Sequence, residues 1–214
     1  KVRALLDYLN LPHNRVQVNP MRIKKSVSFA GDWGKTPVWK MHDGEVVVDS
    51  TPIMMRIDEV HNDGQLASSS NLARRDEWIE WADLHIKNAT IPILYGSIGS
   101  ALSTTRSVSR HEKFGLMTGR LYAWAGFPIM WGIIARKRTK NTGMNPKQLW
   151  HHLLDKWTGE IGEQQFFGGN EPDLVDLIVY GYMRSIEMHP KAFRHIEDHK
   201  EGMSWFKRMK GVAA

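Results

Sequence analysis

The spacing of apolar residues changes once along the chain, near residues 61–71, and this change restricts the folds open to it. Before it, short helix and strand patterns alternate; after it, apolar residues recur at helical spacing in every segment. Residues 63–71 contain Gly64 and three consecutive serines, which is typical of a linker. We therefore predict an α/β domain over residues 1–62, a linker over 63–71 and an all-helical domain over 72–214.

The predicted order of elements in the first domain is helix, strand, helix, strand, strand, helix. Asp43-Gly44 lies between two runs rich in β-branched residues and predicts a hairpin turn. Ser50 precedes Thr51 and Pro52, and this pattern predicts a helix start with Ser50 as the cap. The predicted helices cover residues 2–10, 23–29 (a weak pattern) and 50–60, and the predicted strands cover 15–19, 36–40 and 45–49.

The second domain is predicted to contain helices over residues 76–103, 112–137, 146–160, 173–188, 192–199 and 204–209. Asp173 and Asp176 form a capping-box pattern before an apolar run, so we expect both carboxylates to be structural. The stretch 121–135 carries no charge, but it is shorter than the roughly 20 apolar residues that span a bilayer, and it contains Pro128. We expect a buried, kinked helix there, with contact at a membrane surface as the alternative.

None of the 214 residues is cysteine, so the side chains of this sequence offer neither disulfides nor thiol chemistry. Nothing in it therefore indicates secretion. His195 and His199 have the spacing of zinc ligands on a helix, but no third ligand is near them in the sequence. We predict no metal site and no other enzyme class, since phosphate-binding loops and Ser-His-Asp patterns are not found.

The net charge of +6 and the pI of about 9.5 are a mild basic excess rather than the charge typical of a nucleic-acid-binding protein. Basic residues gather at 22–25, 136–140 and 207–210. Such runs are most often solvated faces. The alternative is contact with RNA phosphates or with an anionic membrane surface.

Several sequence blocks resemble the glutathione transferase superfamily and, within it, the membrane-associated prostaglandin E synthase type 2 subfamily. They follow the order of that subfamily along nearly the whole chain. The blocks are residues 1–8, Val18-Asn19-Pro20, Asp49-Ser50, Trp81-Ala82-Asp83, Lys113-Phe114-Gly115, Asp155-Lys156-Trp157, Phe167-Gly168-Gly169-Asn170 and Tyr180-Gly181.

This resemblance implies an α/β plus all-α fold: a thioredoxin/glutaredoxin-like domain lacking its first strand, followed by the helical domain of glutathione transferases. In the subfamily a Cys-x-x-Cys motif stands directly before the residues that match Lys1. The resemblance therefore implies either that the sequence is a fragment or that this relative differs at its amino terminus. The insertion that the subfamily carries between its two domains is not found here.

The resemblance also implies a ligand site. Thr36 and Pro37 match the position where a cis peptide bond lets the backbone pair with the cysteinyl unit of glutathione. Asp49 and Ser50 match the pair that binds the γ-glutamyl group, where Ser50 would donate to its carboxylate and Asp49 would accept from its ammonium group. The alternatives are a turn proline at the start of a strand and an ordinary helix cap.

Other site elements of the subfamily are missing. A histidine and a serine that face the ligand correspond to Asn88 and Ile91, and His85 lies almost one turn earlier. We therefore predict a non-catalytic binding module, or a subunit of a larger assembly, with a homodimer as another form of partnership. Glutathione is the expected ligand and haem is implied by the resemblance. The expected location is mitochondrial or cytoplasmic, with peripheral membrane contact as an option.

The alternative function is a glutathione-dependent isomerase that acts on a prostaglandin endoperoxide or a similar lipid peroxide. Because this sequence contains no cysteine, its Cys-x-x-Cys motif would have to lie upstream of Lys1. We therefore predict no catalytic residue within the 214 residues.

Overall fold

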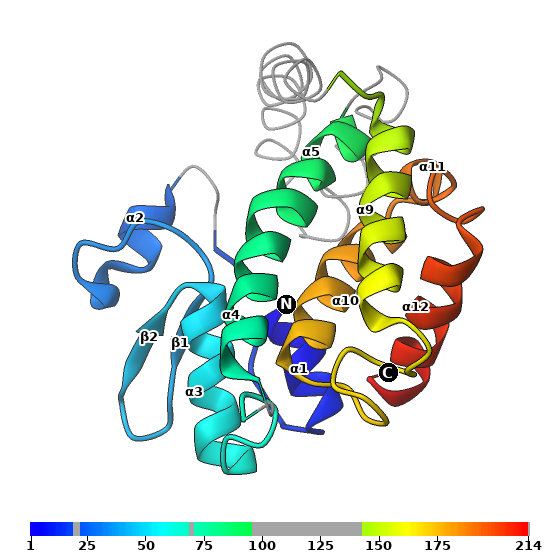
Figure 1. Cartoon of the computed structure of the whole chain (residues 1–214). Coiled ribbons are helices and arrows are strands. Elements are labelled where there is room, and N and C mark those ends of the chain that lie inside the picture. Colours follow the sequence, from blue (N-terminus) through cyan, green and yellow to red (C-terminus); the bar gives the residue numbers. More distant parts are fainter. Residues whose placement is uncertain (19–21, 69–70, 96–142, 214) are drawn as a thin grey trace.

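The computed structural model describes residues 1–18, 22–68, 71–95 and 143–213. The amino-terminal part holds a small sheet beside helices, and the rest of the described chain is helical (Figure 1). Its elements are α1 (Val2–Tyr8), α2 (Ile23–Ser26), a 3₁₀ turn (Ser28–Ala30), β1 (Val38–Lys40), β2 (Val46–Val48) and α3 (Ser50–Asn62).

The predicted hairpin is confirmed. Strands β1 and β2 pair antiparallel, with Val38 opposite Val48 and Lys40 opposite Val46. At the turn the Asp43 carboxylate accepts the amide of Glu45 at 2.9 Å, and Gly44 has a φ of 96°, which favours glycine. The turn chemistry read from the sequence therefore sets the register of this sheet.

Two predictions in the amino-terminal part need correction. Residues 15–18 form no strand, and Val16 is 82% exposed; within the described residues the sheet consists of β1 and β2. The weak helix predicted over 23–29 is split into α2 and the 3₁₀ turn.

The helical part begins with α4 (Leu72–Trp81), continues through a π-helical turn (Ala82–Ile86) into α5 (Lys87–Tyr95), and resumes with α9 (Pro146–Ile161). It ends with α10 (Leu174–Glu187), α11 (Pro190–Phe193) and α12 (Lys200–Val212). The helix predicted over 112–137, its uncharged stretch 121–135 and the predicted residues 96–103 lie outside the described residues. No helix in the described part has the length and apolar character needed to cross a membrane.

The prediction of one helix over residues 192–199 is wrong. Helix α11 ends at Phe193, residues 194–198 form turns, and His199 starts the next helix as its cap. The Nδ1 atom of His199 accepts the amide of Gly202 at 3.0 Å, so this side chain satisfies the first turn of α12 instead of continuing a helix. His195 and His199 therefore do not share a helix.

Helix α10 lies at the centre of the fold. Its side chains are buried almost throughout, and it packs against α1 as well as α4, α5 and α12 (Figure 1). Gly181 allows the closest approach, because a Cβ placed on it would lie 2.5 Å from the backbone nitrogen of Lys1. One apolar cluster thus joins α1 and α3 to the helical part.

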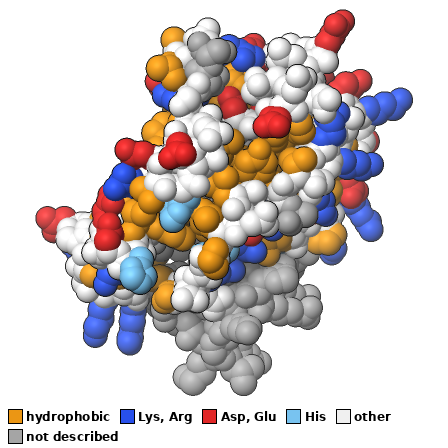
Figure 2. All heavy atoms as spheres, turned by 90° about the horizontal axis from the view of Figure 1, so that it is seen from below, with side chains coloured by type: hydrophobic (Ala, Val, Ile, Leu, Met, Phe, Trp, Pro, Cys, Tyr) orange, Lys and Arg blue, Asp and Glu red, His pale blue; other side chains and the backbone are white. Residues whose placement is uncertain are grey.

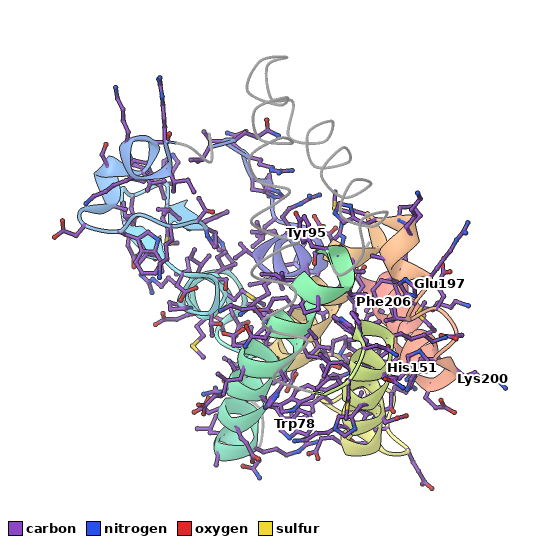
Figure 3. The ribbon with its side chains drawn as sticks, turned by 90° about the horizontal axis from the view of Figure 1, so that it is seen from above. Trp78, Tyr95, His151, Glu197, Lys200 and Phe206 are labelled. Carbon is purple, nitrogen blue, oxygen red and sulfur yellow. The ribbon has the colours of Figure 1, made fainter. Side chains whose placement is uncertain are left out.

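Aromatic side chains fill the space between α4, α9 and α12. The Trp157 ring stacks on Phe167 at 5.6 Å and meets Trp205 edge-on at 5.2 Å. Trp78 lies 5.7 Å from Trp157, and Figure 3 shows it between α4 and α9. The abundance of tryptophan in the sequence is therefore explained in part by helix packing.

Candidate ligand cradle at the start of α3

The structure brings the two predicted ligand pairs together. The Thr36–Pro37 peptide bond is cis, and Pro37 directly precedes β1. Because Val38 pairs with Val48, Pro37 and Asp49 lie at the same end of the hairpin. We call Thr36, Pro37, Asp49 and Ser50 the cradle.

Asp49 rather than Ser50 caps α3, which corrects the predicted cap. The Asp49 carboxylate accepts the amide of Ser50 at 2.6 Å and faces the Ser50 hydroxyl at 3.4 Å. Pro52, the third residue of the helix, has no amide hydrogen, so the Asp49 side chain cannot accept a hydrogen bond from that position. A ligand carboxylate at this helix end would have to share or replace the contact between Asp49 and Ser50.

A polar network next to the cradle was not predicted from the sequence. The ammonium of Lys1 donates to Thr51 Oγ1 at 2.9 Å and to Asp83 Oδ1 at 2.7 Å. The hydroxyl of Tyr182 donates to the same Asp83 oxygen at 2.6 Å. Helices α1, α3 and α10 and the π-helical turn thus meet at one carboxylate, and we call these four residues the Asp83 network.

Burial and charge oppose each other in the Asp83 network. Burial lowers the pKa of Lys1, and the hydrogen bond and charge of Asp83 partly restore it. Burial also acts to raise the pKa of Asp83, but hydrogen bonds from Lys1 and Tyr182 outweigh it and leave this pKa below its ordinary value. The pKa of Tyr182 is raised by burial and by its bond to Asp83. The ion pair with Lys1 and the hydrogen bond from Tyr182 thus both stabilise the carboxylate form of Asp83.

The remaining candidate residues have local contacts. The ring of His85 lies 6.0 Å from that of Trp81, and Asn88 donates to the carbonyl of Leu84. Ile91 is half-buried on α5. His85 and Asn88 are exposed on their helices, and none of the three residues belongs to the cradle or to the Asp83 network.

Asp173 and Asp176 form the predicted capping box at the start of α10. Asp176 also accepts the indole N–H of Trp205 at 3.0 Å and the amides of Phe167 and Gly168, each at 3.1 Å. Both carboxylates hold the backbone, as predicted. Within the described residues, no group of three His, Asp or Glu side chains is arranged to hold a metal ion.

The basic groups differ in their surroundings. Arg208 donates to the carbonyl of Gln165, and Lys210 pairs with Glu187. Lys24 and Lys25 are exposed on α2. The run 136–140 lies outside the described residues.

The surface seen from below carries hydrophobic side chains across its middle and charged ones along its margins (Figure 2). One hollow, of about 530 Å³, lies between α3 and α4 and is lined in part by Pro52, Met55 and Leu72. Another, of about 400 Å³, is lined in part by Tyr8 and Pro172. Neither hollow is lined by the cradle residues.

Comparison with known proteins shows the fold. A family profile described as the glutathione S-transferase N-terminal domain matches residues 1–65. The solved structure of a glutathione S-transferase of Ceriporiopsis subvermispora, in complex with glutathione, superposes with a TM-score of 0.64 at 14% identity, covering 99% of this chain and 88% of that chain. The chain therefore has the glutathione transferase fold, with a thioredoxin-like amino-terminal part and a helical remainder.

Two curated relatives are named prostaglandin E synthase 2. That of Danio rerio is 26% identical over 253 residues, and that of Mus musculus is 25% identical over 265 residues. Each comparison covers 98% of this chain and 66% of the relative, so the chain spans less than two thirds of their length. Fold, profile and relatives together support the glutathione transferase superfamily, with similarity to prostaglandin E synthase 2. Glutathione, one of the two ligands that the resemblance implies, is bound in the Ceriporiopsis subvermispora structure, and these comparisons give no support to haem.

Proposed function

We propose that this chain binds a glutathione-like peptide at the cradle and serves as a binding module or as a subunit of a larger assembly. The main support is the position of Thr36-Pro37 beside Asp49-Ser50 in a glutathione transferase fold whose 214 residues contain no cysteine. The ligand would supply the sulfur, and the protein would supply only its binding site.

The chemistry of the cradle suits such a peptide. The exposed backbone at Thr36 can pair with the cysteinyl unit as an added strand. The amino end of α3, which is 13 residues long, favours a carboxylate through its amides and its dipole. Asp49 would then turn from the Ser50 amide toward the ligand ammonium group.

A binding measurement tests this proposal. Isothermal titration with reduced glutathione is expected to show binding by the parent chain and a clear loss of affinity in Ser50→Ala. Ser204→Ala serves as the control, because Ser204 is an exposed serine on α12 whose hydroxyl accepts from Arg208. Equal affinities in the parent and Ser50→Ala would remove Ser50 from the site.

The assembly role has its own support and test. Val60 and Leu72 are 43% and 54% exposed, and the 530 Å³ hollow between α3 and α4 lies close by. We propose mitochondria as the first compartment to examine. Size-exclusion chromatography of native extract is expected to find the protein in a complex or a homodimer, and elution as a monomer would contradict both.

A second candidate function is glutathione-dependent isomerisation of a prostaglandin endoperoxide or a similar lipid peroxide. It is favoured by the alignment with proteins named prostaglandin E synthase 2, which covers 98% of this chain. The nucleophilic thiol would have to lie outside these 214 residues. The gene sequence upstream of the codon for Lys1 tests this candidate: a Cys-x-x-Cys motif there would favour it, and a full-length protein without cysteine would exclude it.

The exposed lysines of α2 support one further proposal, contact with RNA or with an anionic membrane surface. Co-sedimentation with anionic vesicles and gel-shift assays with RNA would separate the two. Binding that is unchanged in Lys24→Ala/Lys25→Ala would contradict a role for α2.

A further inference from the structure

We propose that Asp83 is a positioning residue for the cradle, acting from the helical part on the first turn of α3. This inference rests on the proposed function, because it assigns a residue to the same ligand site. Asp83 lies 34 positions after Asp49 in the sequence and belongs to another element.

The connection runs through short contacts. Lys1 donates both to Asp83 Oδ1 at 2.7 Å and to Thr51 Oγ1 at 2.9 Å, so one ammonium bridges the carboxylate and the helix turn. The Thr51 hydroxyl also faces Asp83 Oδ2 at 3.5 Å. Thr51 directly follows Ser50, and a shift of Thr51 therefore moves the cradle residue beside it.

Burial makes this bridge sensitive to the charge of Asp83. The side chain of Lys1 is 5% exposed and that of Asp83 is 31% exposed. Removal of one partner from a buried ion pair leaves the other charge without compensation. Without the carboxylate, the Lys1 ammonium gains by moving toward water, and it then loses its bond to Thr51.

The Asp83 carboxylate is itself held from two sides. Asp83 sits in the π-helical turn, an irregularity often found at functional sites, and Tyr182 on α10 donates to Oδ1 at 2.6 Å. The fold thus fixes the carboxylate before any ligand binds, which is what a positioning group requires.

A second ion pair between the two parts supplies a matched control. Arg184 on α10 donates to the carboxylate of Asp7 on α1. Their side chains are 30% and 23% exposed, close to the exposure of Asp83. This pair joins α1 to the helical part. Within the described residues, neither Asp7 nor Arg184 has a hydrogen bond to the first turn of α3. General docking of the two parts should depend on both pairs, and cradle geometry should depend on Asp83 alone.

The experiment compares Asp83→Asn, Asp83→Glu and Asp7→Asn in the full chain by glutathione titration and by hydrogen exchange of the amides of Ser50, Thr51 and Ile53. We expect Asp83→Asn to weaken binding about 3- to 30-fold and to speed exchange at these amides. Asp83→Glu should restore part of both effects because it keeps the charge. Asp7→Asn should lower the melting temperature with neither effect.

Two results would overturn the inference: equal losses of affinity in Asp83→Asn and Asp7→Asn, or unchanged affinity and exchange in Asp83→Asn. If the parent chain binds no glutathione, the proposed function fails separately. Exchange at the first turn of α3 then decides the inference alone, with unchanged rates in Asp83→Asn counting against it.

Discussion

The two carboxylate oxygens of Asp173 have different surroundings. Its Oδ1 accepts the amides of Val175 and Asp176 at 2.8 and 3.1 Å. Its Oδ2 is buried without a hydrogen-bond partner among the described residues. Burial, followed by the charge of Asp176, raises the pKa of Asp173 well above its ordinary value. A proton bound by Asp173 would therefore be carried on Oδ2, because Oδ1 is occupied by the two amides.

This arrangement predicts a pH effect of definite sign. A carboxyl whose pKa is higher in the folded state binds more protons when folded, so its contribution to stability falls as pH rises from the unfolded toward the folded pKa. Asp173→Asn keeps an acceptor for the cap and does not titrate. We expect its stability relative to the parent, measured by urea unfolding, to improve between pH 4 and pH 8. The same difference at both pH values would contradict a raised pKa.

His199 gives a second prediction for a single residue. Its Nδ1 caps α12 through Gly202, and its Nε2 lies 3.0 Å from Asp155. Asparagine is a good cap and alanine is not, so His199→Ala should cost about 1 kcal/mol more in the free energy of unfolding than His199→Asn. Chemical denaturation of the two variants measures this difference. Equal losses would mean that the contact with Asp155, and not the cap, carries the stability.

Among the elements, the contact between α1 and α10 depends on Gly181. A Cβ placed there would lie 2.5 and 2.6 Å from the backbone nitrogen and Cα of Lys1, so the two elements must separate in Gly181→Ala. We expect a loss of about 1–3 kcal/mol in the free energy of unfolding. Gly159→Ala on α9 is the control: its Cβ would meet nothing within 4 Å, and alanine favours the helix. A Gly181→Ala protein as stable as the Gly159→Ala protein would contradict the close approach.

Elements with strong local signals were predictable from the sequence. The Asp43-Gly44 turn gave the hairpin, and Asp173 with Asp176 gave the start of α10. Residues 15–18 alternate like a strand, but they lie outside the two-stranded sheet of the described residues, and alternation alone does not show whether a segment joins a sheet. The predicted helix over 192–199 failed because His199 forms a cap, an option that helical spacing does not reveal.

One part of the candidate site was likewise predictable from the sequence, and another part was not. The proximity of Pro37 and Asp49 follows from the hairpin, so its position could be predicted once the turn was found. The bond from Lys1 to Asp83 joins residues 82 positions apart, and it depends on the packing of α1 against α10 and on the π-helical turn. No local pattern in the sequence indicates such a contact.

At the scale of the whole molecule, the amino-terminal part and the helical part share one apolar core. Leu5 on α1 and Ile53 on α3 are completely buried and belong to the same cluster as Trp157 on α9 and Trp205 on α12. A shared core favours cooperative unfolding, because the loss of one part exposes apolar surface of the other.

This feature predicts how a change in one part affects the other. Leu5→Ala removes buried methyl groups from α1 and should cost about 2–5 kcal/mol in the free energy of unfolding. Urea unfolding can be followed by tryptophan fluorescence, to which buried Trp150, Trp157 and Trp205 of the helical part contribute, and by far-ultraviolet circular dichroism. We expect both midpoints to fall together in Leu5→Ala and to stay unchanged in Val16→Ala, since Val16 is 82% exposed. If the fluorescence midpoint stayed at its parent value while part of the dichroism signal was lost at lower urea, the amino-terminal part would unfold alone. The core would then not couple the two parts, and a carboxylate in the helical part could not hold the first turn of α3.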